Sequence, residues 1–462
     1  RAFLRTCAGC PCRLGRLYLE MGKGRGRIMV GRRKPELLIP AGSLEVLRTA
    51  VIFGADAVYI GGEAFGLRAK AKNFSPEEMA EGIAFAHARG VKVYVTANIL
   101  AHNDDLEGAA AYFKELRDME PERCDGLIIS DPGMFAIARE VWPEAEIHIS
   151  TQANNTNYRT YRFWWELGAR RVVSARELSL AEIRAIRERI PEEMEIESFV
   201  QGSMCISYSG RCLLSNYFTG RDANQGSCTH PCRWKYAVVE ETRPGEYLPV
   251  YENERGTYIF NSKDLCMIEH IPELVEAGID SFKVEGRMKT ALYIATVART
   301  YRRAIDDYFI SGERYRANLD WYRAEISKCT YRQFTTGFYF GKPAGEAQIY
   351  DNSTYVNEYI YLGNIEEVAA GDALPWREEK ENGDVCKLAR FEQRNKFSVG
   401  EAIEIMKPDG RNVPVTVEAM YNGEGEAVES CPHARETIWV RLSEAPAPWD
   451  LLRRENRAGA GA

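Results

Sequence analysis

Residues 57–96 contain two apolar runs, AVYI at 57–60 and VKVYVT at 91–96, with one helical segment between them. The helix has a clear beginning, because Ser75 lies at the N-cap, Pro76 at the first helical position, and Glu78 completes a capping box. Gly90 follows the helix and marks its end. This order of strand, helix and strand predicts a βαβ unit with two parallel strands.

The same alternation continues on both sides of this unit. Short apolar runs separated by longer segments occur at residues 37–40, 57–60, 91–96, 126–129, 146–149, 171–174, 194–200 and 281–285. Eight parallel strands favour a closed barrel over an open sheet. We therefore predict an α/β fold, a (β/α)8 TIM-like barrel over residues 35–312.

The chain changes character after the barrel. We interpret residues 313–346 as a connecting segment. Residues 347–445 contain short alternating strands and turns such as KPDG at 407–410, which predicts a small all-β, barrel-like domain. Residues 454–462 have no apolar period, and we expect residues 446–462 to form a flexible tail.

The first 34 residues form a basic leader. Residues 1–28 contain seven Arg and Lys residues but only one acidic residue, Glu20. Their cysteines at 7, 10 and 12 have no obvious fourth ligand nearby. We expect this leader to be disordered or non-native, with Met29 as the start of the protein.

Composition narrows the class of protein. With 462 residues, 45% of them apolar, the chain is long enough for a large barrel and a second domain. No run of eighteen apolar residues occurs, so we expect no membrane partner. Twelve cysteines without an apolar export segment predict a cytoplasmic protein with metal-binding thiols. The net charge of -7 argues against broad electrostatic binding to nucleic acid.

A cysteine-rich insertion at residues 201–260 separates the seventh and eighth runs. Cys205, Cys212, Cys228 and Cys232 follow the spacing C-x6-C-x15-C-x3-C. Four thiolates from one loop can close a tetrahedral zinc site or hold a 4Fe-4S cluster. The wide spacings favour the cluster, because structural zinc usually has a close cysteine pair at both ends. Buried structural thiols are the remaining alternative.

The insertion follows a barrel strand, so it emerges at the carboxyl end, where barrel enzymes carry their active sites. Three arginines, Arg211, Arg221 and Arg233, flank the thiolates. They balance the charge of an anionic cluster, bind a substrate carboxylate through two hydrogen bonds, or are ordinary surface charges. Other candidate catalytic residues lie at the ends of the fifth and eighth runs, just after these runs, or between the insertion and the eighth run: His148, Gln152, Glu285, Arg287, Lys263 and Asp264. For His148 the alternative is a structural role, and for Glu285 with Arg287 an ion pair that closes the barrel.

The pattern Glu197-x-Phe199-x-x-Gly202-Ser203-x-Cys205, followed by Ser-Gly-x-Cys212, resembles the signature of the collagenase-like peptidase U family. Further similar blocks lie at residues 59–61, 73–75, 148–152, 261–266, 283–289 and 335–341. The length and the β-rich C-terminal part are most similar to the tRNA hydroxylation branch of the family. The shorter proteins of anaerobic ubiquinone synthesis are less similar.

The resemblance implies an enzyme that hydroxylates the wobble uridine of tRNA to 5-hydroxyuridine without oxygen. It implies a 4Fe-4S cluster, prephenate as hydroxyl donor, and three partners: the tRNA anticodon loop, this small carboxylate co-substrate and a paralogous subunit. The alternatives are an iron-sulfur hydroxylase of a small aromatic or quinone substrate, a collagenase-like peptidase, and a non-catalytic cluster-bearing subunit. Peptidase activity is least favoured, because the chain has no His-Glu-x-x-His pair and no Gly-x-Ser-x-Gly elbow.

Two groups of residues are candidates for contact with tRNA. A wobble base lies in a loop and can enter a barrel mouth without opening a duplex. We expect Tyr208, Tyr217 and Phe218 to stack on it. Because the chain is acidic, contact with phosphates needs a local basic patch, for which the candidates are Arg390, Arg394 and Lys396.

Overall fold

The structure is a computed structural model that describes residues 33–67, 73–205, 207–234, 237–239, 247–249, 261–342, 348–349, 356–374 and 387–456. Residues 1–32 of the basic leader, with its three cysteines, and the last six residues lie outside the described residues, as do Cys386 and parts of the insertion. Among the described segments, none of the helices combines the length and apolar character that crossing a bilayer requires.

Eight parallel strands form a closed barrel, which confirms the predicted fold class. They are β1 (Glu36–Pro40), β2 (Ala57–Gly61), β3 (Lys92–Ala97), β4 (Gly126–Ile129), β5 (Ile147–Ile149), β6 (Arg171–Val173), β7 (Glu195–Ser203) and β12 (Ser281–Val284). Each strand pairs with its neighbour along the chain. The ring closes at β12, where Ser281 is in register with Glu36 of β1 and Glu197 of β7.

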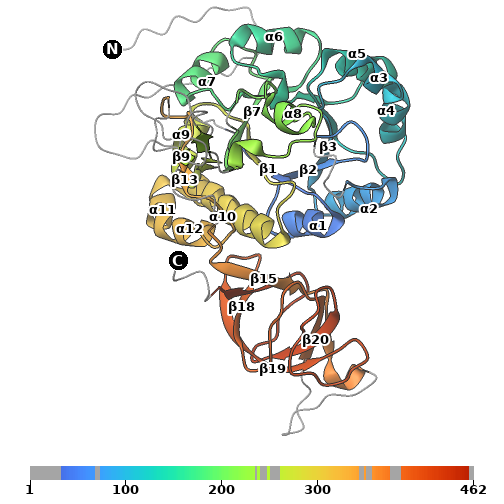
Figure 1. Ribbon diagram of the computed structural model, residues 1–462, viewed down its shortest axis with the longest axis vertical. Coiled ribbons are helices and arrows are strands. Elements are labelled where there is room, and N and C mark those ends of the chain that lie inside the picture. Colours follow the sequence, from blue (N-terminus) through green and yellow to red (C-terminus); the bar gives the residue numbers. More distant parts are fainter. Residues whose placement is uncertain are drawn as a thin grey trace, which may run out of the picture. The chain divides into compact units, whose positions relative to one another are not determined.

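Helices surround the strands, and Figure 1 shows them as an outer ring with the short helix α8 drawn across the middle. The helices of the ring are α1 (Leu44–Ile52), α2 (Pro76–His87), α3 (Asn103–Leu106), α4 (Ala109–Arg117), α5 (Pro132–Val141), α6 (Tyr158–Glu166), α7 (Leu180–Arg187), α9 (Ile271–Glu276) and α10 (Ala291–Ile310). Helix α2 has the predicted capping box, in which the Ser75 side chain accepts from the Glu78 N–H. Two further helices follow: α11 (Gly312–Ala317) and α12 (Leu319–Ile326).

The insertion, together with the residues that follow it up to 266, adds small elements at the carboxyl end of β7. They are α8 (Leu214–Thr219), β8 (Ala237–Val239), β9 (Tyr247–Pro249), β10 (Asn261–Ser262) and β11 (Asp264–Cys266). Strand β11 runs antiparallel to the end of β7 and parallel to β13 (Phe334–Thr335), while β10 pairs with β14 (Gln348–Ile349). The seventh strand therefore continues beyond the barrel and supports the insertion.

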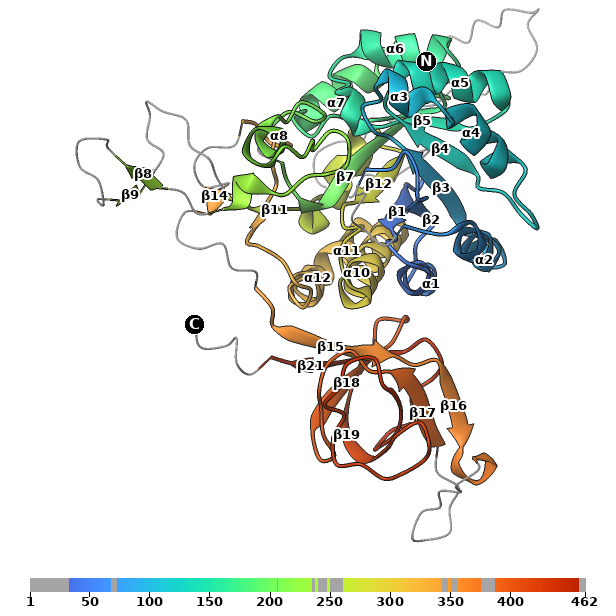
Figure 2. The ribbon, with the colours of Figure 1, turned by 45° about the vertical axis from the view of Figure 1, so that its right-hand side comes forward.

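The C-terminal domain is a seven-stranded antiparallel sheet with the order β15-β21-β18-β19-β20-β17-β16. In Figure 2 its strands curl around a common interior, as expected for a barrel-like domain. The bounds are β15 (Tyr359–Asn364), β16 (Glu367–Ala370), β17 (Lys387–Glu392), β18 (Ala402–Met406), β19 (Asn412–Tyr421), β20 (Thr437–Leu442) and β21 (Leu451–Glu455).

The predicted tail at residues 446–462 begins too early. Strand β21 lies inside that range and pairs with both β15 and β18. Its residues Leu451, Leu452 and Arg453 are fully buried. Burial of two adjacent leucines holds this segment in the sheet, and the domain therefore extends to about residue 455.

Candidate active site at the mouth of the barrel

The loop that carries Cys205, Cys212, Cys228 and Cys232, which we call the cysteine loop, is held over the carboxyl ends of the barrel strands. The Thr151 hydroxyl, after β5, donates to Ser209 Oγ at 3.3 Å, and the Ser209 N–H donates to Glu177 Oε1, after β6, at 2.7 Å. The Leu100 N–H, after β3, donates to the Asn224 carbonyl at 3.0 Å. Three strand-end loops thus bind the insertion and place it at the mouth, as the sequence predicted.

Two glycines allow close backbone approach at this mouth. Gly210 has a φ of +70°, and a Cβ there would lie 2.1 Å from the Gln152 carbonyl oxygen. Gly202 has a φ of +114°, and a Cβ there would lie 2.5 Å from the Glu285 carbonyl oxygen. Only glycine fits both the conformation and the space. Gln152 therefore lies against the cysteine loop, and Glu285 against the end of β7.

The four predicted ligands are accessible, and none of them forms a disulfide in the structure as described. Cys205 is exposed, while Cys212, Cys228 and Cys232 are half-buried. The Cys212 carbonyl accepts from Asn224 Nδ2 at 2.9 Å, and Cys228 Sγ accepts from the His230 N–H at 3.4 Å. Their chemistry fits an iron-sulfur cluster, because four reduced thiols share one loop.

The four thiols are not arranged as the ligands of one metal site. Among the residues that the structure describes, no three His, Cys, Asp or Glu side chains are arranged to hold a metal ion. Cysteines elsewhere differ in their surroundings: burial raises the pKa of the Cys124 and Cys266 thiols to about 12. Such core thiols stay protonated at neutral pH and are poor ligands.

Arg176 is a site residue that the sequence analysis missed. Its Nη2 donates to Glu285 Oε2 at 3.1 Å, and its Nη1 donates to the Ser203 carbonyl at 2.9 Å and lies 4.0 Å from Cys205 Sγ. The guanidinium also lies 4.1 Å from the centre of the Phe199 ring. Arg176 therefore links Glu285 to the first cysteine. Its place just after β6, at a strand end, was a signal that could have found it.

Arg287 spans the mouth from β12 to the ends of β2 and β3. Its Nη1 donates to Thr96 Oγ1 at 2.8 Å, and its Nη2 donates to Asn73 Oδ1 at 3.3 Å. The guanidinium is buried, and a Cβ at Gly61 would lie 2.5 Å from Nη2. A glycine at the end of β2 therefore provides the space that Arg287 fills.

His148 lies in the barrel interior, in the middle of β5 rather than at the mouth. It is fully buried, and its Nε2 is 2.8 Å from Glu146 Oε1. Burial lowers the pKa of His148, and the nearby Arg171 guanidinium lowers it further. The imidazole is therefore neutral at neutral pH. Its surroundings correspond to the structural alternative for this residue.

Asp264 lies in a buried ion pair. Its Oδ1 accepts from Arg332 Nη2 at 2.6 Å, and its Oδ2 accepts from the Arg332 N–H at 3.1 Å. This pair holds β11 beside the segment that leads into β13 and does not point the carboxylate at the mouth. The neighbouring Lys263 is half-buried, between β10 and β11.

The arginines of the insertion and of the β-domain differ in their surroundings. Arg211 is exposed and Arg221 half-buried, whereas the side chain of Arg233 lies outside the described residues. In the β-domain, Arg390 Nε is 3.0 Å from Glu367 Oε2, and Arg394 Nη2 is 2.6 Å from Glu45 Oε2. These ion pairs neutralise most of the basic patch that the sequence predicted there.

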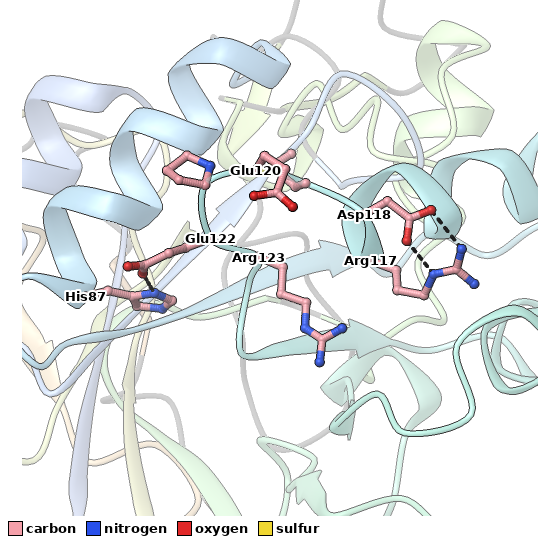
Figure 3. Close-up of a pocket in the computed structure, with 8 residues that line it drawn as sticks. His87, Arg117, Asp118, Glu120, Glu122 and Arg123 are labelled. Atoms are coloured by element: carbon pink, nitrogen blue, oxygen red, sulfur yellow. Dashed lines mark hydrogen bonds and ion pairs between the residues drawn. The ribbon is translucent and has the colours of Figure 1, made fainter.

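A hollow lies at the amino end of the strands, opposite the mouth. Figure 3 shows its lining, which comes from the end of α2 and from residues 117–123, just before β4. The cavity has a volume of about 510 Å³. The His87 imidazole bonds to Glu122 through Nδ1 and lies 2.8 Å from Asp125 Oδ2 through Nε2. Asp125 also accepts from the Val93 N–H at 2.7 Å, so this cluster joins α2, β3 and β4.

The His87 cluster predicts a pH-dependent stability. Burial disfavours the charged imidazole, but the hydrogen bonds to Asp125 and Glu122 outweigh it and raise the pKa of His87 above its usual 6.5. Its stabilising contribution is therefore fully present below pH 6.5 and disappears as the pH rises through the folded-state pKa. Urea unfolding at a series of pH values should show the stability difference between wild type and His87→Gln shrinking towards alkaline pH. A difference that stays constant or grows would contradict this.

The fold and the site define a class: a (β/α)8 barrel whose mouth is covered by a four-cysteine loop and which is followed by a small antiparallel β-domain. The chain belongs to peptidase family U32, whose family model matches residues 42–349 and whose C-terminal domain model matches residues 377–453. The family resemblance seen in the sequence is confirmed. The C-terminal match ends at residue 453 and so extends into β21, beyond the start of the predicted tail.

Several proteins are similar to this chain over most of its length. It is 39% identical to tRNA hydroxylation protein P1 of Bacillus subtilis, over 91% of this chain and 95% of that protein. It is also 39% identical to tRNA hydroxylation protein P of Escherichia coli, over 90% and 95% of the two chains. A 23S rRNA 5-hydroxycytidine synthase of Escherichia coli is 32% identical over 74% of this chain and 50% of that protein.

Proposed function

We propose that this protein is a tRNA-modifying enzyme that converts the wobble uridine to 5-hydroxyuridine. The observation that carries the proposal is the 39% identity, over nine tenths of the chain or more, to two proteins named for tRNA hydroxylation. A third relative is named for making 5-hydroxycytidine in rRNA, which supports hydroxylation at the 5 position of a pyrimidine. An unpaired wobble base can reach a barrel mouth without the opening of a duplex.

The proposed cofactor is a 4Fe-4S cluster held by Cys205, Cys212, Cys228 and Cys232. When bound, such a cluster would supply redox chemistry. Arg176 would act as a positioning residue, because it contacts both Cys205 Sγ and the Glu285 carboxylate. A guanidinium beside a ligating sulfur would also tune the reduction potential of the bound cluster.

The proposed hydroxyl donor is prephenate, a small co-substrate with two carboxylates. Arg211 and Arg221, together with Arg233, are the candidates to bind these carboxylates, because guanidinium groups bind carboxylates through two parallel hydrogen bonds. Arg211 and Arg221 lie on the cysteine loop and retain access to solvent. Gln152 lies against that loop and Glu285 against the end of β7, where they can orient the reacting groups.

The experiment that tests the function is nucleoside analysis of tRNA from a strain that lacks this protein. We expect 5-hydroxyuridine to disappear and to return when the wild-type chain is supplied. Unchanged 5-hydroxyuridine would exclude the proposal and favour a small aromatic or quinone substrate. Iron, sulfide and zinc analysis of anaerobically purified protein tests the cofactor separately.

Arg287 provides a prediction for the mouth of the barrel. Arg287→Ala should lower the formation of 5-hydroxyuridine roughly 10- to 100-fold, because misplacement of a positioned group at a reaction centre has effects of that size. Iron content should stay at the wild-type level, since Arg287 is not a cluster ligand. Complementation of the deletion strain and iron analysis of the variant measure the two quantities. Loss of iron together with unfolding would instead assign Arg287 a purely structural role.

A further inference from the structure

The cysteine loop carries large apolar side chains that folding leaves in water. In the described part of the chain, five such side chains that are exposed belong to residues 208–234: Tyr208, Leu213, Tyr217, Phe218 and Trp234. Exposed apolar patches of this kind mark interaction sites. Three of the rings form one surface, since Tyr217 is 83% exposed, Trp234 47% and Phe218 41%.

These three rings, which we call the aromatic platform, lie next to one another. The ring centres of Tyr217 and Phe218 are 5.3 Å apart, and those of Phe218 and Trp234 are 6.2 Å apart. Tyr217 and Phe218 belong to α8, which begins two residues after Cys212, and Trp234 follows Cys232 by two residues. The platform therefore borders the cysteines themselves.

Hydrogen bonds inside the loop hold the platform in place. Ser215 Oγ lies 3.0 Å from Thr229 Oγ1 and accepts from the Thr229 N–H at 3.0 Å. Thr219 Oγ1 lies 3.2 Å from Thr229 Oγ1 and donates to the Ser215 carbonyl at 2.8 Å. These contacts join α8 to the segment between Cys228 and Cys232. Rings attached to a fixed support lose little further entropy when a partner binds them.

We propose that the aromatic platform binds unpaired bases of the tRNA anticodon loop by stacking, so that the neighbouring base enters the barrel mouth. This inference rests on the proposed function. Stacking on aromatic rings is the usual way in which proteins hold unpaired bases, and it does not depend on a basic surface. It therefore explains how a chain with a net charge of -7, in which Arg390 and Arg394 of the β-domain are paired with carboxylates, would bind an RNA loop.

The test measures binding of an anticodon stem-loop RNA to the anaerobically purified, cluster-loaded full chain. Tyr217→Ala and Trp234→Ala should each weaken binding about 5- to 100-fold, the range seen when a stacked ring is removed. Tyr217→Phe and Trp234→Phe keep a ring and should bind nearly as wild type. Phe163→Ala is the matched control, because Phe163 is 53% exposed but lies on α6 of the outer ring. Iron content and unfolding curves should be unchanged in all five variants.

The possible results distinguish failure of the platform proposal from failure of the proposed function. Wild-type protein that does not bind the stem-loop would overturn both proposals. Wild-type protein that binds, with Tyr217→Ala and Trp234→Ala binding equally well, would overturn the platform alone. Conversion of a dimer to a monomer by these variants, with RNA binding unchanged, would also overturn it and assign the surface to a second copy of the chain. Because stacking is uncharged, wild-type binding should fall only weakly with salt; a steep fall would assign the binding to phosphate contacts instead.

Discussion

Single replacement of Cys205, Cys212, Cys228 or Cys232 by Ala is expected to remove the iron-sulfur chromophore and to abolish formation of 5-hydroxyuridine. Each iron of a 4Fe-4S cluster takes one cysteine sulfur, so the four losses should be similar rather than graded. Iron and sulfide analysis of anaerobically prepared protein measures the first effect. Nucleoside analysis of tRNA from the complemented deletion strain measures the second.

The chain offers matched controls for these four cysteines. Cys124, Cys329 and Cys431 are buried in the structure, and burial raises the pKa of the Cys266 thiol to about 12. Their replacement by Ala or Ser should leave iron content near the wild-type level, and we expect the same for Cys386. One zinc per chain without sulfide would refute the cluster. Hydroxylation of tRNA in cells by Cys212→Ala would refute the proposed mechanism.

The barrel could be predicted from the sequence because its signals are local. Each strand is a short apolar run, and helix α2 begins with a capping box that lies within four consecutive residues. All eight predicted runs correspond to barrel strands, with bounds that differ by a residue or a few. The position of the cysteine loop could be predicted from the order of the elements along the chain. A loop that directly follows a barrel strand emerges at the carboxyl end of the barrel.

Partners that lie far apart in the sequence could not be predicted. Asp264 pairs with Arg332, which lies 68 residues further along the chain, and Arg176 pairs with Glu285 across 109 residues. Strand β21 was missed for the same reason. Only Leu451 and Leu452 mark it as apolar, and two residues are too few to show the alternation of a strand. In the fold, the partners of Arg453 come from other elements and allow its burial.

The partners of Arg453 form a buried charge cluster between the barrel helices and the β-domain. Glu325, at the end of α12, accepts from Arg453 Nη2 at 2.9 Å and from Asn412 Nδ2 at 2.9 Å, and it also pairs with Arg299 of α10. Only 2% of the Glu325 side chain is exposed. Burial alone would raise the pKa of Glu325, but Arg299 and Arg453 outweigh it and lower the pKa to about 2. The carboxylate is therefore charged at all ordinary pH values, and its contribution to stability is lost only as the pH falls towards this pKa.

Glu325→Ala is expected to lower the free energy of unfolding by about 3 to 5 kcal/mol, because it leaves two buried guanidinium groups without their shared carboxylate. Asp320→Ala is the control on the same helix. Asp320 is 98% exposed and lies 3.2 Å from the exposed Arg323, so its loss should change the free energy of unfolding by less than about 1 kcal/mol. Urea unfolding of the two variants and of wild type, followed by circular dichroism, measures both effects. Equal stabilities for Glu325→Ala and Asp320→Ala would contradict the argument, because the buried and the exposed pair would then be worth the same.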